Sequence, residues 1–83
     1  MVLVSGFEEA IVGYGVQFNR TVVVYDYAAC LRILMDNDMM SLESAIEYMD
    51  AEVIGSLSVD ESPVFLHRCE SEFVVKKWQD EDR

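Results

Sequence analysis

The fold is decided by residues 21–36, which read TVVVYDYAACLRILMD. The first five are β-branched or aromatic, a composition that predicts a strand over residues 21–25. Their unbroken apolar character predicts burial on both faces of that strand. Asp26 then ends the strand and can cap a helix over residues 27–36 with its side-chain oxygen. This helix carries one cation, Arg32, on an almost wholly apolar surface, so we expect it to lie at the centre of the fold.

The segment before the strand predicts a helix that begins after Ser5, with Glu8 and Glu9 at the positive end of its dipole. Its apolar stripe has helical spacing and consists of Phe7, Ala10, Ile11, Tyr14 and Phe18. Gly13 and Gly15 weaken the last turn and are expected to end this helix.

Downstream, a third helix is expected from Leu42 to Ile54, with Ser41 as its N-cap and Gly55 after its last turn. Its buried stripe is expected to consist of Leu42, Ala45, Ile46, Met49 and Val53. Residues 64–69 predict a second strand, with Pro63 at its start. Residues 71–78 fit either a helix or a strand, and the sequence leaves this alternative open.

Together these segments predict a small single domain of the α+β class, with helices packed on a two- or three-stranded sheet. The expected order is helix, strand, helix, helix, strand and then the uncertain C-terminal segment. Because two strands alone are marginal in water, a third is expected from that segment or from a second subunit. We expect the domain to span residues 1–78 and residues 79–83 to be a frayed tail.

The bulk composition excludes several classes of protein. The 83 residues include 16 acids and 6 Lys or Arg, which gives a net charge of −10. Such a chain cannot hold a phosphate backbone by bulk charge, so we expect no direct binding of nucleic acid. Its hydrophobic content of 52% is too high for a disordered protein. No signal peptide or membrane span is recognisable and the two cysteines lie far apart, so we expect reduced thiols and a cytoplasmic location.

The negative charge is concentrated in one segment. From Asp36 to Glu61 the chain has eight acids and no Lys or Arg. Glu43, Glu47 and Asp50 fall at i, i+4 and i+7, which predicts an acidic stripe on the third helix. The candidate partner-binding residues are Asp36, Asp38, Glu43, Glu47, Asp50 and Glu52. Their field would attract a basic protein surface, although a merely solvated helix face gives the same pattern.

No catalytic, metal or cofactor site is expected. Asp36 begins a stretch that resembles a calcium-binding loop, but its sixth position is Ser41, where the turn needs glycine. His67 and Cys69 share one face of the expected second strand, yet zinc takes three or four protein ligands and only Cys30 remains. The same shortage argues against a Cys–His nucleophile.

Several segments between Phe7 and Leu66 form a familiar pattern. They read EAIVGYG (residues 9–15), VYD (24–26), CLRIL (30–34), SAIEYM (44–49), VIG (53–55) and PVF (63–65). The pattern resembles a family of small proteins of tailed bacteriophages and prophages. The resemblance implies a phage origin and carries over no catalytic residues. By analogy between classes, small acidic phage proteins often inhibit host machinery, including CRISPR–Cas complexes, some of them by imitating DNA.

These observations lead to three hypotheses. The first is a non-enzymatic, anti-CRISPR-like inhibitor that binds a basic, nucleic-acid-handling host protein or defence complex through its acids, as a DNA mimic would. The alternative is a phage structural or assembly module, a homodimer or larger oligomer held by apolar surface that so small a core cannot bury. The third, an enzyme or metal protein that uses His67 and Cys69, has the least support.

Overall fold

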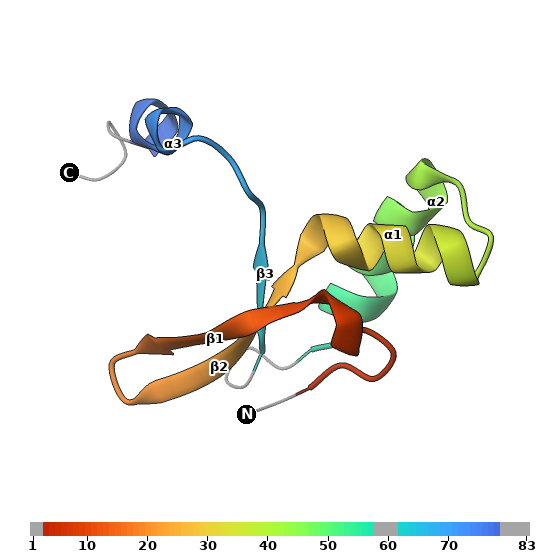
Figure 1. The fold of residues 1–83 in the computed structure, drawn as a ribbon, viewed down its shortest axis with the longest axis horizontal. Helices are drawn as coiled ribbons and strands as arrows, with labels where there is room; N and C mark the ends of the chain where they lie inside the picture. The colour runs from red at the N-terminus through yellow and green to blue at the C-terminus, as the bar shows by residue number, and fades with distance from the viewer. Residues whose placement is uncertain (1–2, 58–61, 79–83) are drawn as a thin grey trace.

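The central strand runs directly into the first helix in a computed structural model, which describes residues 3–57 and 62–78. The elements, in chain order, are η1 (Glu8–Ala10), β1 (Ile11–Gln17), β2 (Arg20–Asp26), α1 (Tyr27–Asn37), α2 (Leu42–Tyr48), η2 (Met49–Ile54), β3 (Val64–Leu66) and α3 (Ser71–Trp78). The three strands form one sheet in the order β1-β2-β3, antiparallel between β1 and β2 and parallel between β2 and β3. Helices packed with a three-stranded mixed sheet confirm the α+β class (Figure 1).

The junction between β2 and α1 lies where the sequence predicts it. Asp26 is the N-cap of α1, and its side chain accepts hydrogen bonds from the backbone N–H groups of Ala28 and Ala29. These two donors have no partner within the helix, so the cap satisfies them. Burial on both faces of β2 was a wrong prediction, because Val23 and Tyr25 are buried while Val22 is only half-buried. The helices cover one face of the strand.

The helix predicted from Ser5 was also wrong, because that segment forms the single turn η1 followed by the strand β1. Gly13 and Gly15 lower its helix propensity, while Val12, Tyr14 and Val16 alternate with them as in a strand. A two-residue turn joins β1 to β2, because Gln17 pairs with Arg20. The third strand of the sheet therefore comes from the N-terminal segment, and the expectation that the C-terminal segment or a second subunit supplies it was wrong.

The third predicted helix is divided into two parts. Ser41 caps α2 as predicted, since its hydroxyl accepts a hydrogen bond from the backbone N–H of Ser44 at 3.2 Å. The chain then continues as a π-helix, η2, whose wider turns keep the four-residue spacing of Ala45, Met49 and Val53 aligned on the core. Leu42 and Ile46, which were expected in the buried stripe, are instead exposed.

The C-terminal part differs from its prediction in length and settles an open alternative. β3 ends at Leu66, three residues earlier than expected, and lies parallel to β2. Residues 71–78 form the helix α3, which stands apart from the other helices at the end of an extended segment (Figure 1). The frayed tail expected at residues 79–83 lies outside the described residues.

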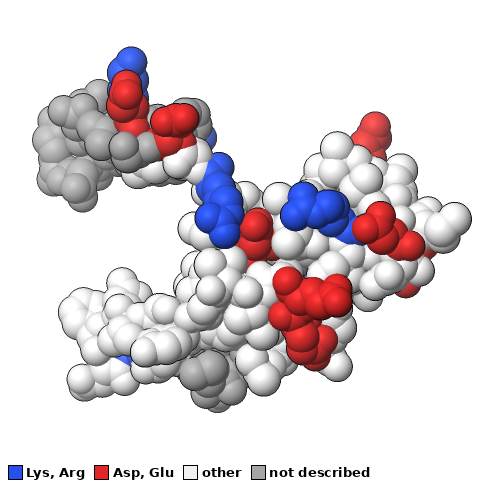
Figure 2. Space-filling model, in the orientation of Figure 1, with Lys and Arg blue, Asp and Glu red and all other residues white. Residues whose placement is uncertain are grey.

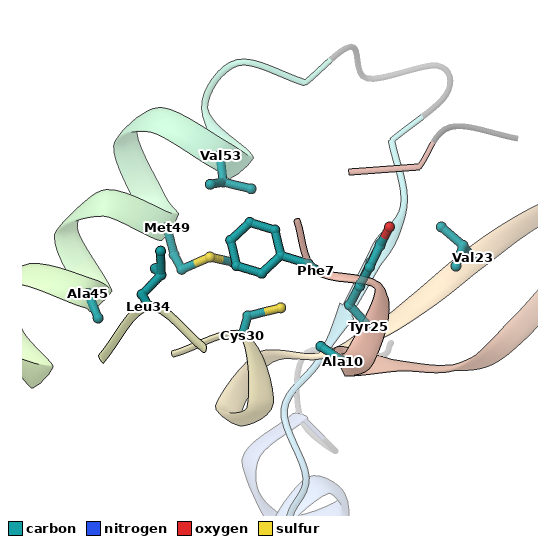
Figure 3. Packing of buried hydrophobic residues seen from close by; sticks show 9 residues of the cluster. All are labelled: Phe7, Ala10, Val23, Tyr25, Cys30, Leu34, Ala45, Met49 and Val53. Atoms are coloured by element: carbon teal, nitrogen blue, oxygen red, sulfur yellow. The ribbon is translucent and has the colours of Figure 1, made fainter. Parts of the chain in front are cut away.

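The core is small and lies between the sheet and the helices. Its buried residues are Phe7, Ala10, Val23, Tyr25, Cys30, Leu34, Ala45, Met49 and Val53. Figure 3 shows the ring of Phe7 among Met49, Val53 and Cys30, with Tyr25 beside it. The hydroxyl of Tyr25 accepts a hydrogen bond from the backbone N–H of Val4 at 2.8 Å, which ties the N-terminal segment to β2. So few buried side chains give a domain of modest stability.

We predict that Gly55→Ala destabilises the fold by about 1–3 kcal/mol, because an added Cβ would lie 2.6 Å from the backbone oxygen of Ala51. Gly13→Ala is the matched control, since a Cβ there meets nothing within 4 Å. Urea denaturation of both variants measures the difference. Equal stability of the two variants would contradict a tight backbone contact at the end of η2.

Candidate functional site

The six candidate acids lie on the helical half of the molecule and are all exposed. Asp36 is in the last turn of α1 and Asp38 is its C-cap, while Glu43 and Glu47 lie one turn apart on α2. Asp50 and Glu52 lie on η2. We call Asp36, Asp38, Glu43, Glu47, Asp50 and Glu52 the acidic surface. Figure 2 shows acids at the α1–α2 end of the visible face, whereas the hairpin end is almost uncharged.

No ion pair joins a described Lys or Arg to the acidic surface, although Arg32 lies one helical turn before Asp36 on α1. The ion pair found among the described residues joins Arg68 to Asp26, which is not one of the six acids. Asp60 and Glu61, which belong to the same acidic stretch of sequence, lie outside the described residues. The negative field of the helical half is therefore left uncompensated by ion pairs in the described parts of the chain.

Asp36 and Asp38 lie at an electrostatically unfavourable position. The C-terminal end of a helix carries the negative end of its dipole, and α1 has no basic residue in its last turn. Stability alone would favour Lys or Arg at these two positions. The helix dipole therefore gives no reason for acids at this end of α1.

Asp50 has a hydrogen-bond partner within the described part of the chain. The hydroxyl of Tyr27 donates a hydrogen bond of 3.1 Å to Oδ1 of Asp50, which connects the first turn of α1 to η2. Partial burial, and then this hydrogen bond with the Asp50 charge, raise the pKa of Tyr27 above its ordinary value. Asp50 thus contributes to the acidic surface and also positions the helices beneath it.

Apolar side chains interrupt the acidic surface. Met39, in the loop between α1 and α2, is 86% exposed, and Leu42 at the start of α2 is 52% exposed. Met39 also has a positive φ of 58°, a conformation that is uncommon for a residue other than glycine. Exposed apolar groups surrounded by charge are typical of surfaces that bind proteins.

A polar cleft that the sequence analysis did not anticipate lies at the carboxyl ends of β2 and β3. Its volume is about 430 Å³ and it is lined by Asp26, Tyr27, Ala28, Arg32, Leu66, His67 and Arg68. The rings of Tyr27 and His67 stack with 4.2 Å between their centroids. This cleft could not be predicted from local sequence patterns, because it depends on the parallel pairing of β2 with β3. That pairing brings residues about forty positions apart to one edge of the sheet.

Asp26 is the electrostatic centre of this cleft. Its Oδ2 accepts a hydrogen bond from Nε of Arg68 at 3.2 Å, while Oδ1 caps α1. The Arg68 hydrogen bond is the largest influence on the pKa of Asp26, which lies below its ordinary value of 3.8. No buried side-chain polar atom of the described residues lacks a partner, so none is left aimed at a ligand. The cleft is therefore best explained as a structural junction.

The structure separates the residues that would be needed for metal or nucleophile chemistry. β3 ends before His67 and Cys69, so these residues do not share a strand face as expected, and both are exposed. Cys30 is buried, and burial raises the pKa of its thiol to about 11, which keeps it protonated at neutral pH. Asp36 lies inside α1 and Ser41 is the N-cap of α2, so the stretch that begins at Asp36 is not a calcium-binding loop. Among the described residues, no group of three or more His, Cys, Asp or Glu could hold a metal ion.

Comparisons with known proteins do not identify a relative. No protein-family model matches the sequence, and no curated protein or solved structure is significantly similar to it. Of the helices that the structure describes, none has the length and apolar character needed to cross a bilayer.

We predict that the contribution of Asp26 to stability depends on pH. Because folding lowers the pKa of Asp26, its stabilising effect is present above the ordinary value and is lost as the pH falls through the lowered one. Asp26→Asn retains a good N-cap and removes the charge. In urea denaturation the variant should be less stable than the parent near neutral pH, and the difference should disappear as the pH falls below the lowered pKa of Asp26. A difference that persists in acid would rule out the ion pair as its cause.

We predict that Asp36→Lys stabilises the fold by less than about 0.5 kcal/mol, because the favourable charge at the C-terminus of α1 is partly offset by repulsion from Arg32 one turn earlier. Asp36→Asn should give a smaller gain. Thermal and urea denaturation at low ionic strength measure both effects. A loss of stability in the lysine variant would mean that the interaction of residue 36 with Arg32 outweighs its interaction with the helix dipole.

Proposed function

We propose that the protein is a non-enzymatic binding module whose acidic surface docks on a basic surface of a nucleic-acid-handling protein and inhibits it. The observation that carries this proposal is the exposure of six carboxylates that have no described Lys or Arg partner. In a chain with a net charge of −10, such a field steers a basic partner to this half of the molecule.

The arrangement of the acids supports a partner that normally binds nucleic acid. Glu43 and Glu47 lie one helical turn apart, which places successive negative charges about 5–6 Å apart at the level of Cβ. A row of charges at this spacing resembles the series of phosphates along a nucleic-acid strand. A protein site built from Lys and Arg to follow phosphates would accept such a row.

The exposed apolar groups beside the acids support a protein partner over a free cation. Met39 and Leu42 would be buried when a partner covers the acidic surface, and burial of apolar area supplies affinity that charge pairs alone seldom provide. The same mixture of groups has no role in binding a metal ion.

The resemblance to phage proteins extends this proposal to a biological setting. We propose that the partner belongs to a bacterial host, in its cytoplasm, and is a defence complex or another nucleic-acid-handling assembly of the kind that anti-CRISPR proteins inhibit. The expected complex contains no cofactor. The catalytic alternative has little support, since Cys30 is buried with a protonated thiol.

A second candidate function is that of a structural or assembly module. It is favoured by the exposed apolar side chains of the hairpin, above all Tyr14, Val16 and Phe18. The two functions are compatible, because these side chains lie on the strand half of the chain and the acidic surface lies on the helical half.

The test of the proposed function is capture of partners from a bacterial host lysate at about 0.05 M and about 0.5 M salt. Immobilised protein should retain a basic nucleic-acid-handling protein at low salt and release it at high salt. Added double-stranded DNA should compete with the retained protein, because both would occupy the same basic surface.

The decisive variant is Glu43→Lys combined with Glu47→Lys, which should lose at least about tenfold in affinity for the captured protein. The matched control combines Glu70→Lys with Glu72→Lys, which changes the net charge equally with two exposed acids outside the acidic surface. Equal losses of affinity in the two double variants would mean that net charge alone explains the loss, which would contradict docking at the acidic surface. Undiminished binding by the Glu43→Lys and Glu47→Lys variant would also refute the proposal.

A further inference from the structure

The outer edge of β1 is open. β1 is the first strand of the sheet, and no described strand pairs with its other side. In an antiparallel pair, alternate residues direct their backbone N–H and C=O groups away from the neighbour, so β1 presents a row of these groups along its free edge. The pairing with β2 is regular from Gly13 to Gln17, because the irregularity of β1 lies between Ile11 and Gly13. This regular part is a template for another strand.

The sequence of β1 lacks the usual protection of an edge strand. Its seven residues, IVGYGVQ, include no charged residue and no Pro, although the chain as a whole is 27% charged. Isolated proteins usually place Lys, Pro or inward-pointing charges on such an edge to prevent pairing. An uncharged edge in a chain with a net charge of −10 is also the place where two copies repel each other least.

Large apolar side chains accompany this edge. Tyr14 is 72% exposed and Val16 is 67% exposed, while Phe18 in the turn is 92% exposed. Tyr14 lies opposite Val23, so it shares the face of the sheet on which Val23 is buried. Tyr14 is nonetheless exposed, and the helices lie away from the turn of the hairpin (Figure 1). The hairpin thus carries core-type side chains that its own chain does not cover.

We propose that β1 of one copy pairs antiparallel with β1 of a second copy, so that two three-stranded sheets join into one sheet of six. A two-fold axis perpendicular to the sheet keeps Tyr14 and Val16 of both copies on the same face, where they form one continuous apolar surface. The proposal does not depend on the proposed function, and it leaves the acidic surface of each copy free.

The charges at the two ends of β1 select the antiparallel arrangement. Glu8 and Glu9 precede the strand at one end, and Arg20 follows it just beyond the turn at the other. Antiparallel pairing brings the Arg20 end of each copy toward the Glu8 and Glu9 end of the other. Parallel pairing would bring the acids of both copies together. In the antiparallel arrangement, the β1 edges of two copies are therefore complementary in charge and in backbone hydrogen bonding.

Sedimentation of the intact chain from about 1 to about 100 µM tests the dimer. The parent protein should be dimeric in the upper part of this range, and Tyr14→Lys combined with Val16→Lys should weaken the dimer at least about 100-fold. The matched control combines Met39→Lys with Leu42→Lys, two exposed apolar residues of the helical half, and should remain dimeric. A parent protein that is monomeric throughout overturns the proposal, as does a β1 variant that dimerises normally.

A charge exchange tests the orientation. Arg20→Glu should weaken the dimer by roughly tenfold, because the reversal acts twice in a symmetric interface, and adding Glu8→Arg and Glu9→Arg to the same chain should restore it. Failure of the restoring substitutions would exclude the antiparallel arrangement.

Hydrogen exchange of the parent protein gives a readout that requires no variant. Amides of residues 11–17 should become more protected as the concentration rises through the dimerisation range, while those of β3 should not change. Protection that is independent of concentration in a dimeric sample would place the interface elsewhere and overturn the proposal. If a strand of a different protein occupies this edge instead, the isolated chain will be monomeric, and the proposal is overturned.

Discussion

The structure depends on the burial of Tyr25 in the middle strand. Its side chain is completely buried, its ring stacks on Phe65 of β3 with 5.6 Å between centroids, and its hydroxyl holds the backbone N–H of Val4. Its backbone lies opposite Ile11 of β1 and Phe65 of β3. One residue thus joins the N-terminal segment and all three strands. The next residue, Asp26, begins α1, so the helical half is fixed to the sheet at the same point.

A core that is centred on Tyr25 leaves the far end of the hairpin without helices packed on it. The helices pack over the end of β2 that leads into α1, and the turn of the hairpin extends beyond them (Figure 1). The result is a division of surface chemistry between two halves. The helical half carries carboxylates without described cationic partners, and the strand half carries exposed apolar side chains and an open backbone edge. These two surfaces are the basis of the two interactions that we propose.

Features that depend on neighbouring residues could be predicted from the sequence. The β-branched run ending at Tyr25, the cap at Asp26 and the cap at Ser41 are local, and all three lie where expected. The exposure of the six acids followed from their charge alone. The segment before β2 was assigned wrongly because its apolar residues satisfy helical spacing, whereas its strand state depends on pairing with β2.

Features that depend on distant contacts could not be predicted. The polar cleft requires the parallel pairing of β2 and β3, which no local pattern in the sequence reveals. The π-helical turns of η2 interrupt the single helix that the sequence pattern predicts, and no local pattern reveals them. The open edge of β1 could be recognised only once the strand order was known.

The central claim is that the two halves of the molecule bind different partners independently. Amide chemical-shift mapping by NMR, with the captured basic protein added to the dimeric chain, tests it most directly. The account predicts that shift changes are confined to residues 36–52 and that residues 11–17 keep the shifts of the dimer. Changes at residues 11–17, or loss of the dimer when the basic protein binds, would contradict it.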